Sequence, residues 1–310
     1  MASNRAPDFS FNFFATVTVC LMMLGPMVSM AWADEPPGES ESIFRLRSHE
    51  PNLLGYTWDE SGQFMDFTLS VKFKIFERTI RNFSPPSSLN FAFTGRFGQY
   101  FERSSAPVIG KRYNPELFYR HDSDDSYWET GYAHESNGQQ ITTLAAYQQA
   151  QATLERPEYA NDNISRGWDY VRFTYQSRVL ENLGAEHPVL LWATGKWFLE
   201  NGLFQGKPEE YNDWENDPEG KPRNQVDGIT AGIRYMPRTS LSWLPVGNVS
   251  LTYTTGYREI FRYNTFRFEA GVKIVDLPLI FWASHGYNND LARYYRELSA
   301  WGVAIEIGAF

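Results

Sequence analysis

The chain has 310 residues, a formal net charge of -9 at pH 7 and a composition that is 42% hydrophobic and 16% aromatic. The acidic balance argues against nucleic acid as a partner, because phosphate binding needs a basic surface. The length suits one large domain or two small ones. Most of its apolar residues are dispersed among polar ones rather than gathered in blocks.

The N-terminus is the exception to this dispersal. Arg5 precedes an apolar stretch from about Phe11 to Ala31, and Ala31-Trp32-Ala33 supplies a small-x-small pattern. These features predict a secretory signal peptide over residues 1–33, and an N-terminal membrane anchor is the alternative. The only cysteine, Cys20, lies inside this segment, so the exported chain would contain neither disulfides nor thiolates. An acidic, proline-rich flexible arm is predicted over residues 34–50.

Short alternating runs dominate the rest of the chain. Phe67, Leu69, Val71, Phe73 and Ile75 alternate with polar residues, which is the period of a strand with two unlike faces. After residue 33, no run approaches the roughly 18 to 20 apolar residues that a membrane helix needs. The sequence therefore predicts an all-β domain over residues 51–310, with strands near 52–57, 67–75, 89–101, 114–121, 126–135, 167–180, 188–200, 227–236, 248–257, 264–273, 278–286 and 299–309.

The connections distinguish a barrel from a sandwich, which would show the same alternation. If the N-terminus is periplasmic, the long segments 102–113, 137–166, 201–226 and 287–298 all fall on the outer side. Outer-membrane barrels combine long outer loops with short periplasmic turns. The chain also ends in a strand with a terminal aromatic residue, Phe310. We therefore predict a transmembrane antiparallel β-barrel of about 12 strands in the bacterial outer membrane.

One histidine and one serine stand out at the end of a predicted strand. His134 and Ser136 share a face because side chains alternate with a period of two. Along the strand they share parity with aromatic residues, so they are expected to point outward at the outer rim. Polar side chains on the lipid face are costly, and function is the usual reason to keep them. Asp169, on the outward face of the next strand, is placed to orient the histidine while it takes the serine proton.

Other pairs of histidine and serine are weaker candidates. His121 and Ser123 have the same spacing, but they lie in a polar segment expected to form a periplasmic turn. His285 follows Ser284 directly, and adjacent strand residues face opposite ways.

The segments Tyr132-x-His134-x-Ser136-Asn137-Gly138 and Ser165-Arg166-Gly167-Trp168-Asp169 resemble the outer-membrane phospholipase A family. The resemblance extends to Ser104-Ser105-Ala106-Pro107 and Tyr113-Asn114-Pro115-Glu116-Leu117-Phe118. It implies a twelve-stranded barrel that hydrolyses acyl ester bonds of phospholipids and lysophospholipids. His134 would be the base, Ser136 the nucleophile and Asp169 the orienting residue.

The resemblance also implies a calcium ion and activation by homodimerisation. Calcium would be held by the Gln139 carbonyl, the Ser165 hydroxyl and Ser105 of a second protomer. Together with the Gly138 backbone N–H it would stabilise the oxyanion.

The chain departs from the family pattern at three places. The best-known member has asparagine at the position of Asp169, where an aspartate adds charge stabilisation. The loop carboxylate that supports calcium cannot be aligned, and Asp162 and Asp217 are the candidates. The interface glutamine is replaced near Gly95. Two other functions stay open: a non-enzymatic channel or structural barrel, and a lipopolysaccharide deacylase.

Overall fold

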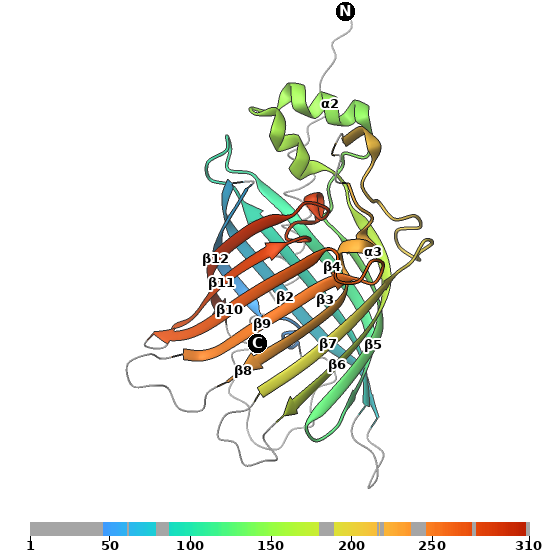
Figure 1. The fold of residues 1–310 in the computed structure, drawn as a ribbon, viewed down its shortest axis with the longest axis vertical. Coiled ribbons are helices and arrows are strands. Elements are labelled where there is room, and N and C mark those ends of the chain that lie inside the picture. Colours follow the sequence, from blue (N-terminus) through green and yellow to red (C-terminus); the bar gives the residue numbers. More distant parts are fainter. Residues whose placement is uncertain are drawn as a thin grey trace, which may run out of the picture. The chain divides into compact units, whose positions relative to one another are not determined.

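The computed structural model describes residues 46–60, 62–78, 87–179, 189–215, 217, 220–236, 246–274 and 277–307. Its strands form one closed antiparallel barrel in which each strand pairs with its neighbours in sequence and β1 closes on β12 (Figure 1). The predicted all-β barrel of about twelve strands is thus confirmed. The strands are β1 Asn52–Asp59, β2 Gly62–Arg78, β3 Ser87–Gln99, β4 Val108–Asp122, β5 Ser126–Ser136, β6 Gly167–Val179, β7 Val189–Phe198, β8 Gly228–Tyr235, β9 Val246–Gly256, β10 Asn264–Ile274, β11 Leu277–Gly286 and β12 Leu298–Ile307.

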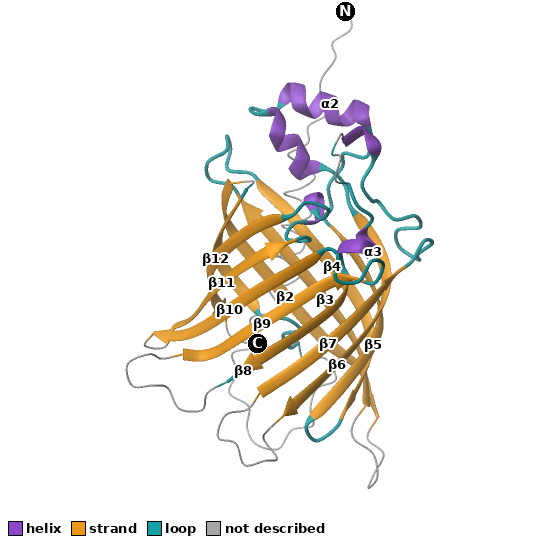
Figure 2. Ribbon diagram, viewed as in Figure 1, coloured by secondary structure: helices purple, strands orange, loops and turns teal. Residues whose placement is uncertain are grey.

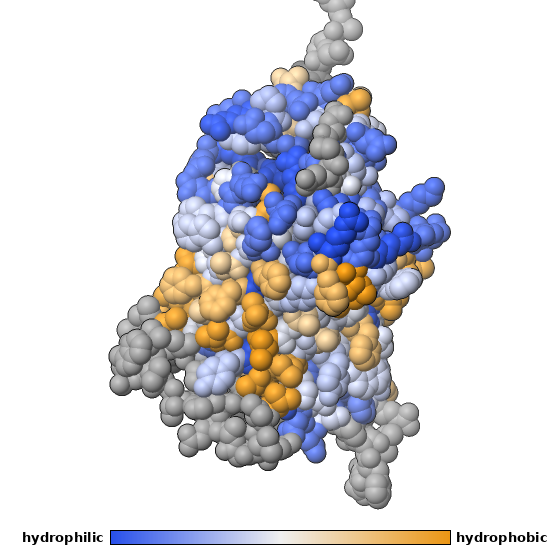
Figure 3. Space-filling model, viewed as in Figure 1, coloured by the Kyte–Doolittle hydropathy of each residue, from blue (hydrophilic) through white to orange (hydrophobic). Residues whose placement is uncertain are grey.

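The outer wall of the barrel is apolar because alternate side chains of each strand point outward. In β6, Val171, Phe173 and Tyr175 are exposed, whereas Arg172 and Thr174 between them are buried. Figure 3 shows the apolar side chains gathered over the strands and hydrophilic residues over the loops at one end. An apolar outward band with aromatic side chains is the surface that an outer-membrane barrel presents to lipid.

The lumen is lined by polar side chains, many of which form ion pairs. Arg172 pairs with Glu116 and also with Glu129, at 2.9 Å. Arg96 pairs with Asp66 at 2.6 Å. Buried charges are tolerated when they are paired in this way. The inward faces of the strands can therefore carry the polar residues that alternate with apolar ones in the sequence.

The helices gather at one end of the barrel (Figure 2). The β5–β6 loop contains α2 (Leu144–Thr153) and the 3₁₀ helix η1 (Pro157–Asn163). The β7–β8 loop contains η3 (Asp213–Glu215) and α3 (Arg223–Val226), and the β11–β12 loop contains η4 (Leu291–Arg293). Among the described residues, no helix is long and apolar enough to cross a membrane.

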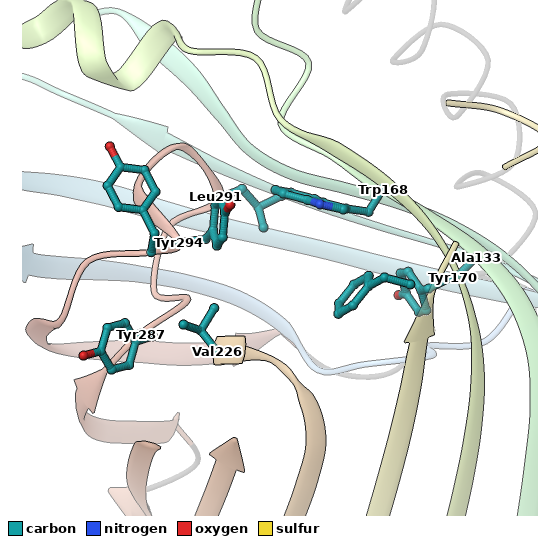
Figure 4. Close-up of a cluster of buried hydrophobic side chains, with 9 residues drawn as sticks. Ala133, Trp168, Tyr170, Val226, Tyr287, Leu291 and Tyr294 are labelled. Atoms are coloured by element: carbon teal, nitrogen blue, oxygen red, sulfur yellow. The ribbon is translucent and has the colours of Figure 1, made fainter. Parts of the chain in front are cut away.

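A cluster of buried apolar side chains supports β5 and β6 from inside this end of the barrel (Figure 4). Ala133, Trp168 and Tyr170 contribute from the inward faces of the two strands. Val226 joins from α3, and the β11–β12 loop contributes further members: Tyr287, Leu291, Tyr294 and Tyr295. Because such cores are closely packed, the outer ends of β5 and β6 are held against loops that are distant in sequence.

The predicted signal peptide (1–33) and Cys20 lie outside the described residues, as does most of the predicted arm (34–50). Of the arm, residues 46–50 are described: Arg47 exchanges backbone hydrogen bonds with Lys72, and the Glu50 N–H donates to Ser70 at 2.9 Å.

Candidate active site

The site begins with a pair of hydrogen-bonded side chains across β5 and β6. The barrel register places His134 directly opposite Asp169, and Nδ1 of the histidine lies 2.7 Å from Oδ1 of the aspartate. Both residues lie at positions whose side chains point out of the barrel. They are at the end of the barrel that carries the long loops. The histidine side chain is 15% exposed and that of the aspartate 0%, so the pair has little screening by solvent.

Ser136 is the last residue of β5 and pairs with Gly167. It points to the same side as His134, one strand repeat or about 6.6 Å further along the chain. The structure therefore brings the three predicted residues onto one outward patch at the rim. Asp169 differs from the prediction in one respect, because it does not face lipid directly.

A short segment of the β7–β8 loop, Gly202 to Gln205, covers Asp169. We call this segment the strap. The N–H groups of Phe204 and Gln205 donate to Asp169 Oδ2 at 2.7 and 3.2 Å. Tyr132 donates its hydroxyl to the same oxygen at 2.6 Å. A Cβ at Gly202 would stand 2.0 Å from Oδ2, so glycine is what permits this close approach. Four donors thus converge on one carboxylate, counting the imidazole.

The chain turns sharply directly after Ser136. Gly138 has φ +64°, and Asn137, 1% exposed, fixes the turn. The Asn137 amide donates to the Ile164 carbonyl at 2.8 Å, and its Oδ1 accepts the Arg166 N–H at 3.0 Å. The predicted oxyanion residue, Gly138, therefore belongs to a turn that the β5–β6 loop holds in place. A left-handed conformation of this kind favours glycine.

One carboxylate near the site is not apparent from the sequence. The Ser165 hydroxyl donates to Glu209 at 2.6 Å, and the Glu209 N–H donates to the Gly167 carbonyl at 2.9 Å. Glu209 belongs to the β7–β8 loop, so only the tertiary fold brings it to Ser165. The two carboxylates predicted for this role are engaged elsewhere. Asp162 is buried between Arg103 and Arg293, each at 2.6 Å, and Asp217 pairs with Arg296 at 2.7 Å.

The structure also places Ser105, the predicted calcium ligand from a second protomer, and Gly95, where the family's interface glutamine is replaced. Ser105 is exposed in the β3–β4 loop with φ +65°. Its neighbour Ser104 donates to Glu155 of the β5–β6 loop at 2.8 Å. Gly95 lies on the outward face of β3, where an added Cβ would meet the Phe97 and Phe93 rings at 3.0 and 3.3 Å.

Charged residues support the site from the lumen. Glu135, between the histidine and the serine, points inward and pairs with Arg223 of α3 at 2.5 Å. Arg223 also contacts Asp227 at 3.0 Å, and Lys196 lies 3.2 Å from the same carboxylate. Burial alone would raise the pKa of Asp227, but Lys196 and Arg223 outweigh it and hold that pKa well below its usual range. The strand that carries His134 and Ser136 is therefore tied from behind to the β7–β8 loop.

The fold and this site define a class of protein: a membrane-spanning β-barrel with a serine, a histidine and an aspartate on its outward face at the rim. A family model described as phospholipase A1 matches residues 31–147. No curated protein sequence matches the chain.

Solved structures match over most of the barrel. Outer membrane phospholipase A from Escherichia coli is 17% identical, with a TM-score of 0.57, over 87% of this chain and 94% of that one. The Salmonella typhi outer membrane phospholipase dimer with bound calcium is 16% identical, with a TM-score of 0.58 and the same coverage. The predicted resemblance to outer-membrane phospholipase A is thus confirmed, as is the predicted barrel.

Proposed function

We propose that this outer-membrane barrel is a calcium-dependent phospholipase that hydrolyses acyl ester bonds of glycerophospholipids and lysophospholipids. The observation that carries the proposal is the 2.7 Å contact between His134 and Asp169 on the outward face, beside Ser136. A site that opens sideways from a barrel is accessible to a lipid diffusing in the membrane. The match to the phospholipase A1 model supports the same activity.

The proposed mechanism assigns one role to each residue. Because Nδ1 of His134 donates to Asp169, Nε2 is left to accept the Ser136 proton. Ser136 then attacks the acyl carbonyl, and the histidine returns the proton to the leaving alcohol. The Asp169 carboxylate stabilises the imidazolium in between. The Gly138 N–H donates to the oxyanion, as preorganised backbone donors do. In the second half of the reaction, water gives its proton to His134 and attacks the acyl-enzyme, and the histidine returns the proton to Ser136 as the fatty acid leaves.

Calcium fits the oxygen-rich corner next to these residues. Ser165 and Glu209 provide a hydroxyl and a carboxylate 2.6 Å apart, and the Gln139 carbonyl is the third proposed ligand. Calcium prefers oxygen ligands of these kinds, so the residues present fit the ion. Bound there, it would supply positive charge toward the developing oxyanion. Ser105 of a second protomer would complete the set in a homodimer.

The test is fatty-acid release from mixed micelles by purified protein, with Ser136→Ala as the variant. Ser299→Ala is the matched control, because Ser299 is also a rim serine next to a histidine, 2.9 Å from His285 Nδ1. We expect Ser136→Ala to abolish release and labelling by a sulfonyl fluoride, and the control to retain both. Chelation of calcium should abolish release by the parent. Equal release with and without Ser136 would refute the assignment, and release that survives chelation would refute the role of calcium.

A further inference from the structure

The strap does more than cover Asp169, because its last residue reaches the strand pair that carries the nucleophile. The Gln205 side chain lies over Gly167: a Cβ built on that glycine would stand 2.5 Å from Oε1 and 3.4 Å from Nε2 of the carboxamide. The carboxamide thus occupies the space that a side chain at position 167 would fill. Gly167 is the direct cross-strand partner of Ser136.

The register gives the separation of the carboxamide from the nucleophile. Side chains of directly opposed residues point to the same face, and their Cβ atoms lie about 4.5 to 5.5 Å apart. A group in the position of the Gly167 side chain therefore stands about 5 Å from the Ser136 Cβ. That gap suits an acyl carbon bound to the serine with its oxygen turned toward the amide, within hydrogen-bonding distance.

The strap also has an apolar side. Leu203 is 84% exposed and Phe204 is 71% exposed, and the Phe204 ring centroid lies 6.1 Å from those of His134 and Tyr132. Two adjacent apolar side chains at this exposure are unfavourable in water but suit the acyl region of a membrane. The strap thus places a carboxamide toward the serine and an apolar pair toward the chains of a lipid.

We propose that the Gln205 carboxamide is a substrate-contacting residue of this site, donating an N–H to the carbonyl oxygen of the scissile acyl ester. The proposal rests on the proposed function and adds a second donor to the Gly138 N–H. The carboxamide would therefore bind the acyl ester group of the lipid and not the phosphate of its head group. Side-chain amides serve as oxyanion donors in other hydrolases.

The experiment compares Gln205→Ala, Gly167→Ala and the double variant by kcat and KM for a phospholipid in mixed micelles. Gly167→Ala keeps the glutamine but puts a methyl group where the carboxamide lies, so it displaces the amide. We expect each single variant to lower kcat about 10²- to 10³-fold with a smaller change in KM. The double variant should be no slower than the slower single variant. Gln225→Ala is the control, because Gln225 is a glutamine of the same loop that contacts Glu259 at 3.1 Å instead.

Three further measurements separate the proposal from other roles. Gln205→Glu should be slower than Gln205→Ala, because a carboxylate cannot donate and repels the oxyanion. The loss in Gln205→Ala should persist with a p-nitrophenyl ester, which has no phosphate. Sulfonyl fluoride labelling of Ser136 should slow in parallel with kcat.

Several results would overturn the proposal. Losses that multiply in the double variant would show that the methyl group, not the missing amide, slows the reaction. A defect confined to phospholipid would assign Gln205 to the head group. An unchanged kcat in Gln205→Ala would show that the carboxamide does not contact the reacting ester. If the proposed function itself is wrong, Ser136→Ala will retain activity, and that variant is measured before the Gln205 variants.

Discussion

Replacing Asp169 with asparagine tests whether the carboxylate is required in this particular barrel. Asp169 accepts from His134 at Oδ1 and from Tyr132, Phe204 and Gln205 at Oδ2. Asparagine has only one acceptor oxygen, and its NH₂ group is a donor. Whichever way the amide is turned, its NH₂ group faces at least one group that donates to Asp169 in the parent protein.

The two orientations of the amide differ in energy. If its oxygen faces His134, the NH₂ group opposes the two backbone N–H groups of the strap, and each buried donor left unsatisfied costs about 1–3 kcal/mol. If its oxygen faces the strap, the amide NH₂ group donates to Nδ1 and the charge-assisted bond to the imidazole is replaced by a neutral one, at a cost of at most about 1.5–3 kcal/mol. The second orientation is therefore favoured. It places a donor against Nδ1 and imposes the tautomer in which Nε2 carries the proton and cannot accept from Ser136.

We expect Asp169→Asn to lower kcat by about 10²- to 10⁴-fold, the upper end being the loss that the same substitution causes in the catalytic triad of a serine protease. Asp169→Ala is the decisive comparison, because alanine imposes no tautomer. Asparagine should be as slow as alanine or slower in fatty-acid release from mixed micelles. An asparagine variant clearly faster than the alanine variant would refute this account of Asp169, and so would one whose kcat stays close to that of the parent.

Two further predictions concern the loops that hold the site. Asp162→Asn should destabilise the outer loops by about 3–5 kcal/mol, since it removes the buried negative charge that pairs with Arg103 and Arg293; hydrogen exchange over η1 would measure this, and unchanged protection would contradict it. The lowered pKa of Asp227 means that its contribution to stability is complete above its unfolded pKa of about 3.9 and is lost as pH falls toward the folded value. Thermal stability should therefore be flat above about pH 5 and fall below about pH 4, and Asp227→Asn should weaken that fall.

Strand periodicity predicted the strands and the faces of their residues, and the lengths of the connections predicted a barrel rather than a sandwich. A period of two leaves no freedom once one outward residue is known, so Phe173 and Tyr175 determined the outward parity of Asp169. The hairpin between β5 and β6 then predicted that Asp169 would lie at the height of His134, and the register places them directly opposite. Both steps depend only on local geometry.

The loop contacts could not be predicted in this way. Glu209 and the strap come from the β7–β8 loop, which has no periodicity and reaches the site only through tertiary packing. Nothing in the sequence distinguishes Glu209 from the many acidic residues around it, or from Asp217, which pairs with Arg296 instead. For the same reason the covering of Asp169 was missed: an outward parity predicts contact with lipid unless a loop folds back over the strand.

A second histidine on the same rim shows why residue types alone do not define the site. His285 lies 2.9 Å from Ser299 and 3.0 Å from Glu297, so a serine, a histidine and a carboxylate meet there too. The histidine is 63% exposed and the glutamate 51%, so water screens their interaction. At the proposed active site, by contrast, the strap removes Asp169 from solvent and fixes it with backbone donors. Burial of the carboxylate gives the histidine a fixed tautomer and a strong partner, and that burial comes from a loop rather than from the barrel.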